Sequence, residues 1–158
     1  MRCVMIAAAV LMSAGPVAAQ TPEEAVGAVL DRLHATASAA DGDAYFALYT
    51  PEARFIGTDA GERWSLEEFR AYAAPHFSAG RGWTYEPTAR TVTIADIECR
   101  CIAWFDEVLD HASYGTLRGS GVLRLTDDGW KVAQYVLSFA VPNDDADAVV
   151  GVIRGEAE

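Results

Sequence analysis

The sequence predicts an α+β domain in which helices come first and cover an antiparallel sheet. Hydrophobic residues recur at helical spacing between positions 22 and 78. From Trp83 onward they alternate with a period of two, and turn residues separate four extended segments. Helices followed by a meander of strands are typical of α+β domains, whose helices pack on one face of the sheet.

The first nineteen residues have the features of a secretory signal peptide. Arg2 is followed by an apolar run from Val4 to Met12, a helix-breaking Gly-Pro pair and small residues up to Ala19. The apolar run is well short of the roughly 20 residues that a transmembrane helix needs. We therefore expect cleavage after Ala19, a mature protein that begins at Gln20 and leaves the membrane, and a periplasmic or secreted location.

Residues 20–158 are expected to form one domain, because about 140 residues suffice for one core and are few for two. The chain has 12 basic and 23 acidic residues, a net charge of −11 that becomes −12 when Arg2 is removed. Such a surface repels nucleic acid and anionic lipid, so neither is expected as a partner. The same acidity also keeps an exported protein soluble.

Capping signals predict where the helices begin. Thr21 to Glu24 combine an N-cap hydroxyl, a proline at the first helical position and a glutamate three residues after the cap. The helix that follows presents an apolar stripe made of Val26, Val29, Leu30, Leu33 and Ala37. A short helix is expected after Asp41 and a short strand at residues 54–57. A second capping box, Ser65 to Glu68, starts a third helix that ends before Gly80.

Strands are expected at residues 83–95, 98–110, 113–126 and 130–141, and a short final helix after Asn143. The turns suggest a register in which Asp110 lies opposite Tyr114 and Thr126 opposite Trp130. Because antiparallel partners have a roughly constant index sum, three rows follow. The rows are Asp106, Arg118 and Ser138; Trp104, Ser120 and Val136; Ile102, Val122 and Gln134.

The even-numbered face of this sheet mixes aromatic, apolar and polar groups, as the lining of a ligand pocket does. The opposite face includes Tyr135, Leu137 and Phe139 and is too apolar for bare solvent. A second copy of the chain is expected to cover it, because large exposed apolar patches are uncommon on monomers.

Asp106 and Arg118 have two interpretations. As a catalytic pair, the carboxylate would be a general base and the guanidinium would stabilise oxyanion charge. As a structural pair, they would form a cross-strand salt bridge. An adjacent arginine lowers a carboxylate's pKa and makes it a poorer base, which favours the structural interpretation. His34 and His76 could each be an acid or base in the pocket or an ordinary histidine at a helix flank.

Ligand contacts are expected from side chains that combine an aromatic or polar group with a place near the pocket. These are Trp64, His76, Trp83, Tyr85, Trp104, Tyr114, Gln134 and Ser138. The aromatic members have the alternative role of core residues. No phosphate-binding loop, dinucleotide fingerprint, nucleophile elbow or zinc-protease motif is present, and no cofactor is expected.

Only Cys99 and Cys101 remain after signal cleavage. In an extended strand, residues two apart are separated by about 6.6 Å, which is at or beyond the usual Cα separation for a disulfide. Two neighbouring thiols are therefore expected. None of the three histidines is nearby in the sequence, so no metal site is expected.

The order of segments resembles the SnoaL-like branch of the NTF2-like superfamily over roughly residues 22 to 154. The resemblance rests on F-I-G-T, S-L-E-E-F-R, G-W-T-Y, A-W-F-D-E, Y-G-T-L-R-G-S-G-V-L and W-K-V-A-Q-Y. It implies an NTF2-like cone, a strongly curved antiparallel sheet wrapped around the N-terminal helices, that commonly forms a homodimer through the sheet's outer face.

The resemblance leaves the function open, because the superfamily includes isomerases, cyclases, hydratases and proteins without catalysis. One hypothesis is an exported protein that binds a small, partly apolar molecule in the cone. A second is a cofactor-independent isomerase, lyase or hydratase acting on a small carbonyl or polyketide-like substrate. A third is a non-catalytic dimerisation or interaction module. No local motif allows the catalytic Asp and Tyr of ketosteroid isomerase to be carried over.

Overall fold

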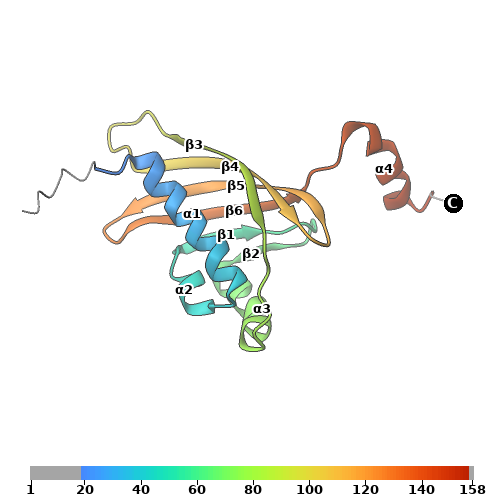
Figure 1. The fold of residues 1–158 in the computed structure, drawn as a ribbon, viewed down its shortest axis with the longest axis horizontal. Helices are drawn as coiled ribbons and strands as arrows, with labels where there is room; N and C mark the ends of the chain where they lie inside the picture. Colours follow the sequence, from blue (N-terminus) through green and yellow to red (C-terminus); the bar gives the residue numbers. More distant parts are fainter. Residues whose placement is uncertain (1–18, 157–158) are drawn as a thin grey trace, which may run out of the picture.

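The computed structural model describes residues 19–156, so nearly all of the predicted signal peptide lies outside the described residues and export stays a prediction. In chain order the elements are α1 (Pro22–Ser38), α2 (Gly42–Phe46), β1 (Tyr49–Ile56), β2 (Arg63–Ser65), α3 (Leu66–Ser78), β3 (Glu86–Ile94), β4 (Ile102–His111), β5 (Gly115–Thr126), β6 (Gly129–Phe139), a 3-10 turn η1 (Asn143–Asp145) and α4 (Ala146–Arg154). Helices α1, α2 and α3 gather on one side of the curved sheet, and α4 lies apart from it (Figure 1). Within residues 19–156 no helix has both the length and the hydrophobicity that crossing a bilayer requires.

The two predicted capping boxes are confirmed. At the start of α1 the Thr21 hydroxyl accepts from the amide of Glu24, and the Glu24 carboxylate accepts from the amide of Thr21 at 2.8 Å. Ser65 and Glu68 make the same pair of bonds at the start of α3. The predicted apolar stripe of α1 is buried along its whole length. Helix α1 therefore packs on the sheet with the face that the sequence indicated.

The sheet has the strand order β2-β1-β6-β5-β4-β3. Strands β3 to β6 form the expected antiparallel meander. Strand β1 begins at Tyr49, earlier than predicted, and pairs in parallel with β6, so the sheet is mixed. The short strand β2, which was not predicted, extends the sheet beyond β1. The fold is thus the α+β arrangement that the sequence predicted, with one parallel pair added.

The predicted register is right for one strand pair and shifted for another. Between β5 and β6, Arg118 lies opposite Ser138 as predicted, although a bulge after Val122 places Gly129 opposite Thr126. Between β4 and β5 the register differs by two residues, so that Asp106 lies opposite Ser120. A shift of two leaves every side chain on the same face of the sheet, because side chains alternate with a period of two.

The assignment of the two sheet faces was wrong. The odd-numbered face is the inner one: Phe105, Leu117, Tyr135 and Leu137 are at most 6 % exposed and belong to the hydrophobic core. The even-numbered face is the outer one, where Trp104 is 49 % exposed. Helices of the same chain bury the more apolar face, so its apolar surface is removed from water without a partner chain. Tyr135 and Leu137 therefore do not form a dimer surface, and dimerisation stays a prediction.

The expectation of two free thiols was also wrong, because Cys99 and Cys101 form a disulfide with a Cα separation of 5.1 Å. An extended strand from residue 98 would place the two Cα atoms about 6.6 Å apart. Strand β4 instead begins at Ile102, and Cys99 lies in a turn. The turn shortens the distance between the two Cα atoms into the range that a disulfide spans.

Candidate functional site

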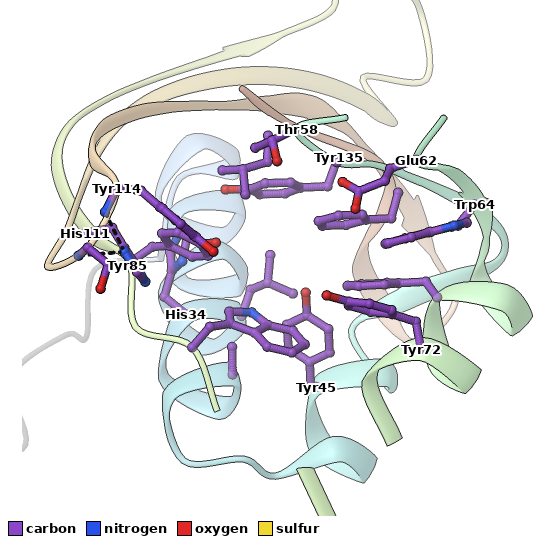
Figure 2. A pocket seen from close by; sticks show the side chains of 18 residues that line it. His34, Tyr45, Thr58, Glu62, Trp64, Tyr72, Tyr85, His111, Tyr114 and Tyr135 are labelled. Carbon is purple, nitrogen blue, oxygen red and sulfur yellow. Dashed lines mark hydrogen bonds between the residues drawn. The ribbon is translucent and has the colours of Figure 1, made fainter. Parts of the chain in front are cut away.

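A cavity of about 320 Å³ lies on the inner side of the sheet, near the ends of β1 and β4 (Figure 2). This volume is within the range of small-molecule pockets. Half of its eighteen lining residues are aromatic: Tyr45, Phe55, Trp64, Phe69, Tyr72, Trp83, Tyr85, Tyr114 and Tyr135. The other half includes two histidines, His34 and His111, and one carboxylate, Glu62. The cavity is thus largely apolar with a few polar groups, which suits a small organic molecule.

The structure brings together five of the predicted site residues and leaves the other six outside the cavity. The cavity is lined by His34, Trp64, Trp83, Tyr85 and Tyr114. The outer face of the sheet carries Trp104, Asp106, Arg118, Gln134 and Ser138, because the faces are exchanged relative to the prediction. His76 lies on α3 beside Tyr72, with ring centroids 5.5 Å apart, and does not line the cavity.

Asp106 and Arg118 do form an ion pair, at 3.8 Å, but both side chains are 53 % exposed. The prediction that this pair lies in the cone is wrong, since neither residue lines the cavity. The structural interpretation fits, although the two residues are diagonal neighbours rather than direct partners. An exposed pair of this kind contributes about 0–1 kcal/mol to stability.

A buried carboxylate, Glu107 of β4, lies behind the cavity wall and is 0 % exposed. Its Oε1 atom accepts from His34 Nε2 and from the Tyr135 hydroxyl, each at 2.8 Å, and its Oε2 atom accepts from Arg90 Nε at 2.8 Å. Burial alone raises the pKa of Glu107, but the hydrogen bonds from His34, Arg90 and Tyr135 outweigh it and hold the pKa below the ordinary value. Glu107 is therefore ionised at neutral pH.

The ionised carboxylate fixes the orientation of His34. A carboxylate only accepts hydrogen bonds, so Nε2 of His34 must carry the hydrogen that it donates to Glu107. Within residues 19–156 no protein group hydrogen-bonds to the other ring nitrogen, Nδ1. The ring belongs to the cavity wall, and its side chain is 11 % exposed. His34 therefore lines a mostly apolar cavity and, within the described residues, has one ring nitrogen without a protein partner.

Three further features hold Glu107 in place. Arg90 of β3 also donates to Asp31 Oδ1 at 2.6 Å and to the Gly27 carbonyl at 3.2 Å, so it links Glu107 to α1. Burial and the nearby carboxylate raise the pKa of Tyr135 well above its ordinary value, so Tyr135 stays protonated and donates. Gly119 lies beside both groups, where a Cβ would be 2.3 Å from the Tyr135 hydroxyl and 2.9 Å from Glu107 Cγ. Only glycine allows this approach.

Tyrosine hydroxyls at the cavity are available to a ligand. Figure 2 shows Tyr85, His111 and Tyr114 grouped on one side, with Trp64 and Tyr72 on the opposite side. Burial raises the pKa of Tyr85 to about 12, so its hydroxyl remains a donor at neutral pH. Within the described residues the hydroxyls of Tyr72, Tyr85 and Tyr114 form no hydrogen bond. They can therefore donate to a carbonyl oxygen of a bound molecule.

The sequence does not predict the centre of this site. Glu107, Arg90 and Tyr135 are not among the predicted site residues, and the prediction that Tyr135 lies on the outer face is wrong. One signal was present: Glu107 alternates with Phe105 and Leu109 on an otherwise apolar strand face. A charged residue on a buried face needs partners, so its presence there indicates a polar cluster.

Solved structures similar to this one share its fold. One is an NTF2-like protein of unknown function from Pseudomonas putida, with a TM-score of 0.63 and 15% identity over 77% of this chain and 89% of that chain. Another is described as a candidate dehydratase of the NTF2-like family from Streptomyces avermitilis, with a TM-score of 0.64 and 17% identity over 76% of this chain and 96% of that chain. A third, from Nostoc punctiforme, is described as having a cystatin-like fold. It has a TM-score of 0.65 and 15% identity over 84% of this chain and 86% of that chain.

A comparison with curated protein sequences finds no match. The family profile described as the SnoaL-like domain matches residues 26–142, which include most of α1, the whole sheet and every residue of the site. This chain belongs to the SnoaL-like domain family.

Proposed function

We propose that the protein binds a small, partly apolar, uncharged carbonyl compound in its cavity and moves a proton on it, as a cofactor-independent isomerase, lyase or hydratase. The observation that carries this proposal is the contact between His34 and Glu107. It combines a histidine in the wall of an aromatic cavity with a buried carboxylate that orients it, as a general base requires.

The residues divide into two roles. Nδ1 of His34 accepts a proton from the carbon next to the substrate carbonyl, and Glu107 stabilises the imidazolium that forms. The Tyr85 or Tyr114 hydroxyl donates to the carbonyl oxygen as negative charge develops there. His34 then returns the proton to another carbon, or to a leaving hydroxyl group that departs as water. Glu107, Arg90 and Tyr135 are positioning residues, since they act through His34.

The charge of the cavity supports an uncharged substrate. Among the described residues that line it there is no lysine or arginine, and Glu62 is the one carboxylate. An anionic substrate would find no cation to pair with, and the net charge of −11 would also repel it. The candidate dehydratase among the similar structures is consistent with such chemistry, although the likeness to it is one of fold.

Export belongs to the same proposal. The signal-like residues 1–19 would direct the protein to a periplasmic or secreted location, where it acts on a molecule that reaches that compartment. The alternative of ligand binding without turnover is favoured by the aromatic walls themselves, which need no base to hold an apolar molecule.

The experiment uses 2-tetralone, an uncharged aromatic ketone with acidic α-hydrogens, incubated with the mature protein in D₂O. NMR measures how fast deuterium replaces the α-hydrogens, and changes in tryptophan fluorescence report binding. The wild type should accelerate exchange over buffer, and His34→Gln should lose about 100-fold of that acceleration. His76→Gln is the matched control, because His76 lies outside the cavity, and it should exchange like the wild type.

Binding without accelerated exchange would contradict catalysis and support the binding-only alternative. Equal exchange rates in the wild type and His34→Gln would contradict the role of His34.

A further inference from the structure

The connection between β3 and β4 contains the disulfide at the end of the sheet where α1 begins (Figure 1). Cys99 is exposed and Cys101 is half-buried. His111, which lines the cavity, is the last of the ten residues of β4 and lies about 30 Å from the disulfide along this extended strand. The disulfide is thus accessible to solvent and independent of the cavity.

The disulfide contributes little to holding the fold together. It joins residues only two positions apart, and the entropy that a cross-link removes from the unfolded chain grows with the length of the loop that it closes. Backbone hydrogen bonds already fix this connection. The amide of Arg100 donates to the Ile97 carbonyl at 2.9 Å, and the amide of Leu125 on β5 donates to the Cys101 carbonyl at 2.8 Å.

The residue between the two cysteines is strained. Arg100 has a φ of 45°, in the left-handed region that non-glycine residues seldom adopt. Arg100 lies within the small ring that the Cys99–Cys101 disulfide closes. Disulfides that are exposed or strained are more easily reduced than buried structural ones.

We propose that the Cys99–Cys101 disulfide is a reversible redox site that oxidises dithiols by thiol–disulfide exchange. A thiolate of the dithiol attacks the exposed Sγ of Cys99, the bond to Cys101 breaks, and Cys101 leaves as a thiolate that takes up a proton. The second thiolate of the dithiol then attacks its own sulfur in the mixed disulfide and releases Cys99, which is also protonated. The dithiol becomes a disulfide, and its two electrons reduce Cys99 and Cys101 to thiols.

The first test equilibrates the mature protein with glutathione buffers of increasing reduced fraction, then counts free thiols by alkylation and mass spectrometry. The dithiol form should become the major species while reduced and oxidised glutathione are both present. The reduced protein should melt within about 2 °C of the oxidised protein. A disulfide that stays closed at the highest reduced fraction would overturn the proposal, as would a melting temperature lowered by more than about 5 °C.

The second test compares two matched variants, each with one cysteine. Cys101→Ser keeps the exposed Cys99, and Cys99→Ser keeps the half-buried Cys101. With oxidised glutathione, Cys101→Ser should form the mixed disulfide at least about tenfold faster, because exposure controls access to the sulfur. Equal rates, or a faster reaction of Cys99→Ser, would contradict Cys99 as the attacked residue.

Discussion

Replacing Glu107 with glutamine tests the buried cluster behind the cavity. The change keeps the size of the side chain but removes its charge and one of its two acceptor oxygens. All three partners of Glu107 are donors: His34 Nε2, the Tyr135 hydroxyl and Arg90 Nε. Because glutamine has a single acceptor oxygen, its amide nitrogen must face at least one of these donors.

The expected cost follows from the burial of this site. A hydrogen bond to a charged group contributes about 1.5–3 kcal/mol, and breaking a buried ion pair costs about 3–5 kcal/mol. Arg90 keeps its second partner, Asp31, at 2.6 Å, which reduces the loss. We expect Glu107→Gln to lower the free energy of unfolding by about 2–4 kcal/mol at pH 7. For a domain of this size that corresponds to a fall in melting temperature of about 10 °C.

The effect should depend on pH in a defined direction. The pKa of Glu107 in the folded protein is below its ordinary value of 4.5, so its stabilisation is fully present above that value. It is lost as the pH falls from about 4.5 through the folded-state pKa. The difference in unfolding free energy between wild type and Glu107→Gln should therefore be constant near neutrality and shrink in acid, by at most about 1.4 kcal/mol per pH unit.

The assay is urea unfolding followed by tryptophan fluorescence between pH 3 and pH 7. Asp106→Asn is the matched control, because Asp106 is on the same strand but half exposed on the outer face. Its unfolding free energy should stay within about 0.5 kcal/mol of the wild type. If the two variants lose similar stability, or if the difference for Glu107→Gln does not shrink in acid, Glu107 is not the buried, paired carboxylate described above.

Three further predictions concern other parts of the molecule. Gly119→Ala should push the Tyr135 hydroxyl away from Glu107, costing about 1–3 kcal/mol in urea unfolding, and an unchanged midpoint would contradict the close approach. The exported protein should begin at Gln20, and the intact mass of the secreted protein tests this. A mass that still includes Met1 would refute it. The mature protein should be a homodimer through the outer sheet face, where Trp104 is a half-exposed aromatic residue. Light scattering should show that Trp104→Glu is monomeric, and a monomeric wild type would contradict the prediction.

Local signals in the sequence were sufficient for most of the secondary structure. Capping boxes depend on residues three apart, so Thr21 and Ser65 could be identified as helix starts without tertiary information. The strand alternation also predicted which residues share a face. It does not show which face the helices cover, because that depends on long-range packing, and the prediction that the more polar face is the inner one is wrong.

The exchange of the two sheet faces affects the predicted site more than it affects the predicted secondary structure. Tyr85, Trp83 and Trp64 lie in connections or short strands beside the cavity, so their placement did not depend on the sheet faces, and the structure confirms that they line it. The predicted location of Asp106 and Arg118 in the cavity depended entirely on which face of the sheet is the inner one. The cluster around Glu107 joins residues of α1, β3, β4 and β6, which are far apart in the sequence, and no local pattern reports such a meeting.

The tautomer of His34 is the measurement that tests the proposed base most directly, and it needs no substrate. Long-range ¹H–¹⁵N NMR distinguishes a protonated from an unprotonated ring nitrogen. The neutral ring should carry its hydrogen on Nε2, which donates to Glu107 at 2.8 Å, and should leave Nδ1 unprotonated as the free base. A neutral His34 with its hydrogen on Nδ1 would place two acceptors against each other at Glu107 and would contradict the account.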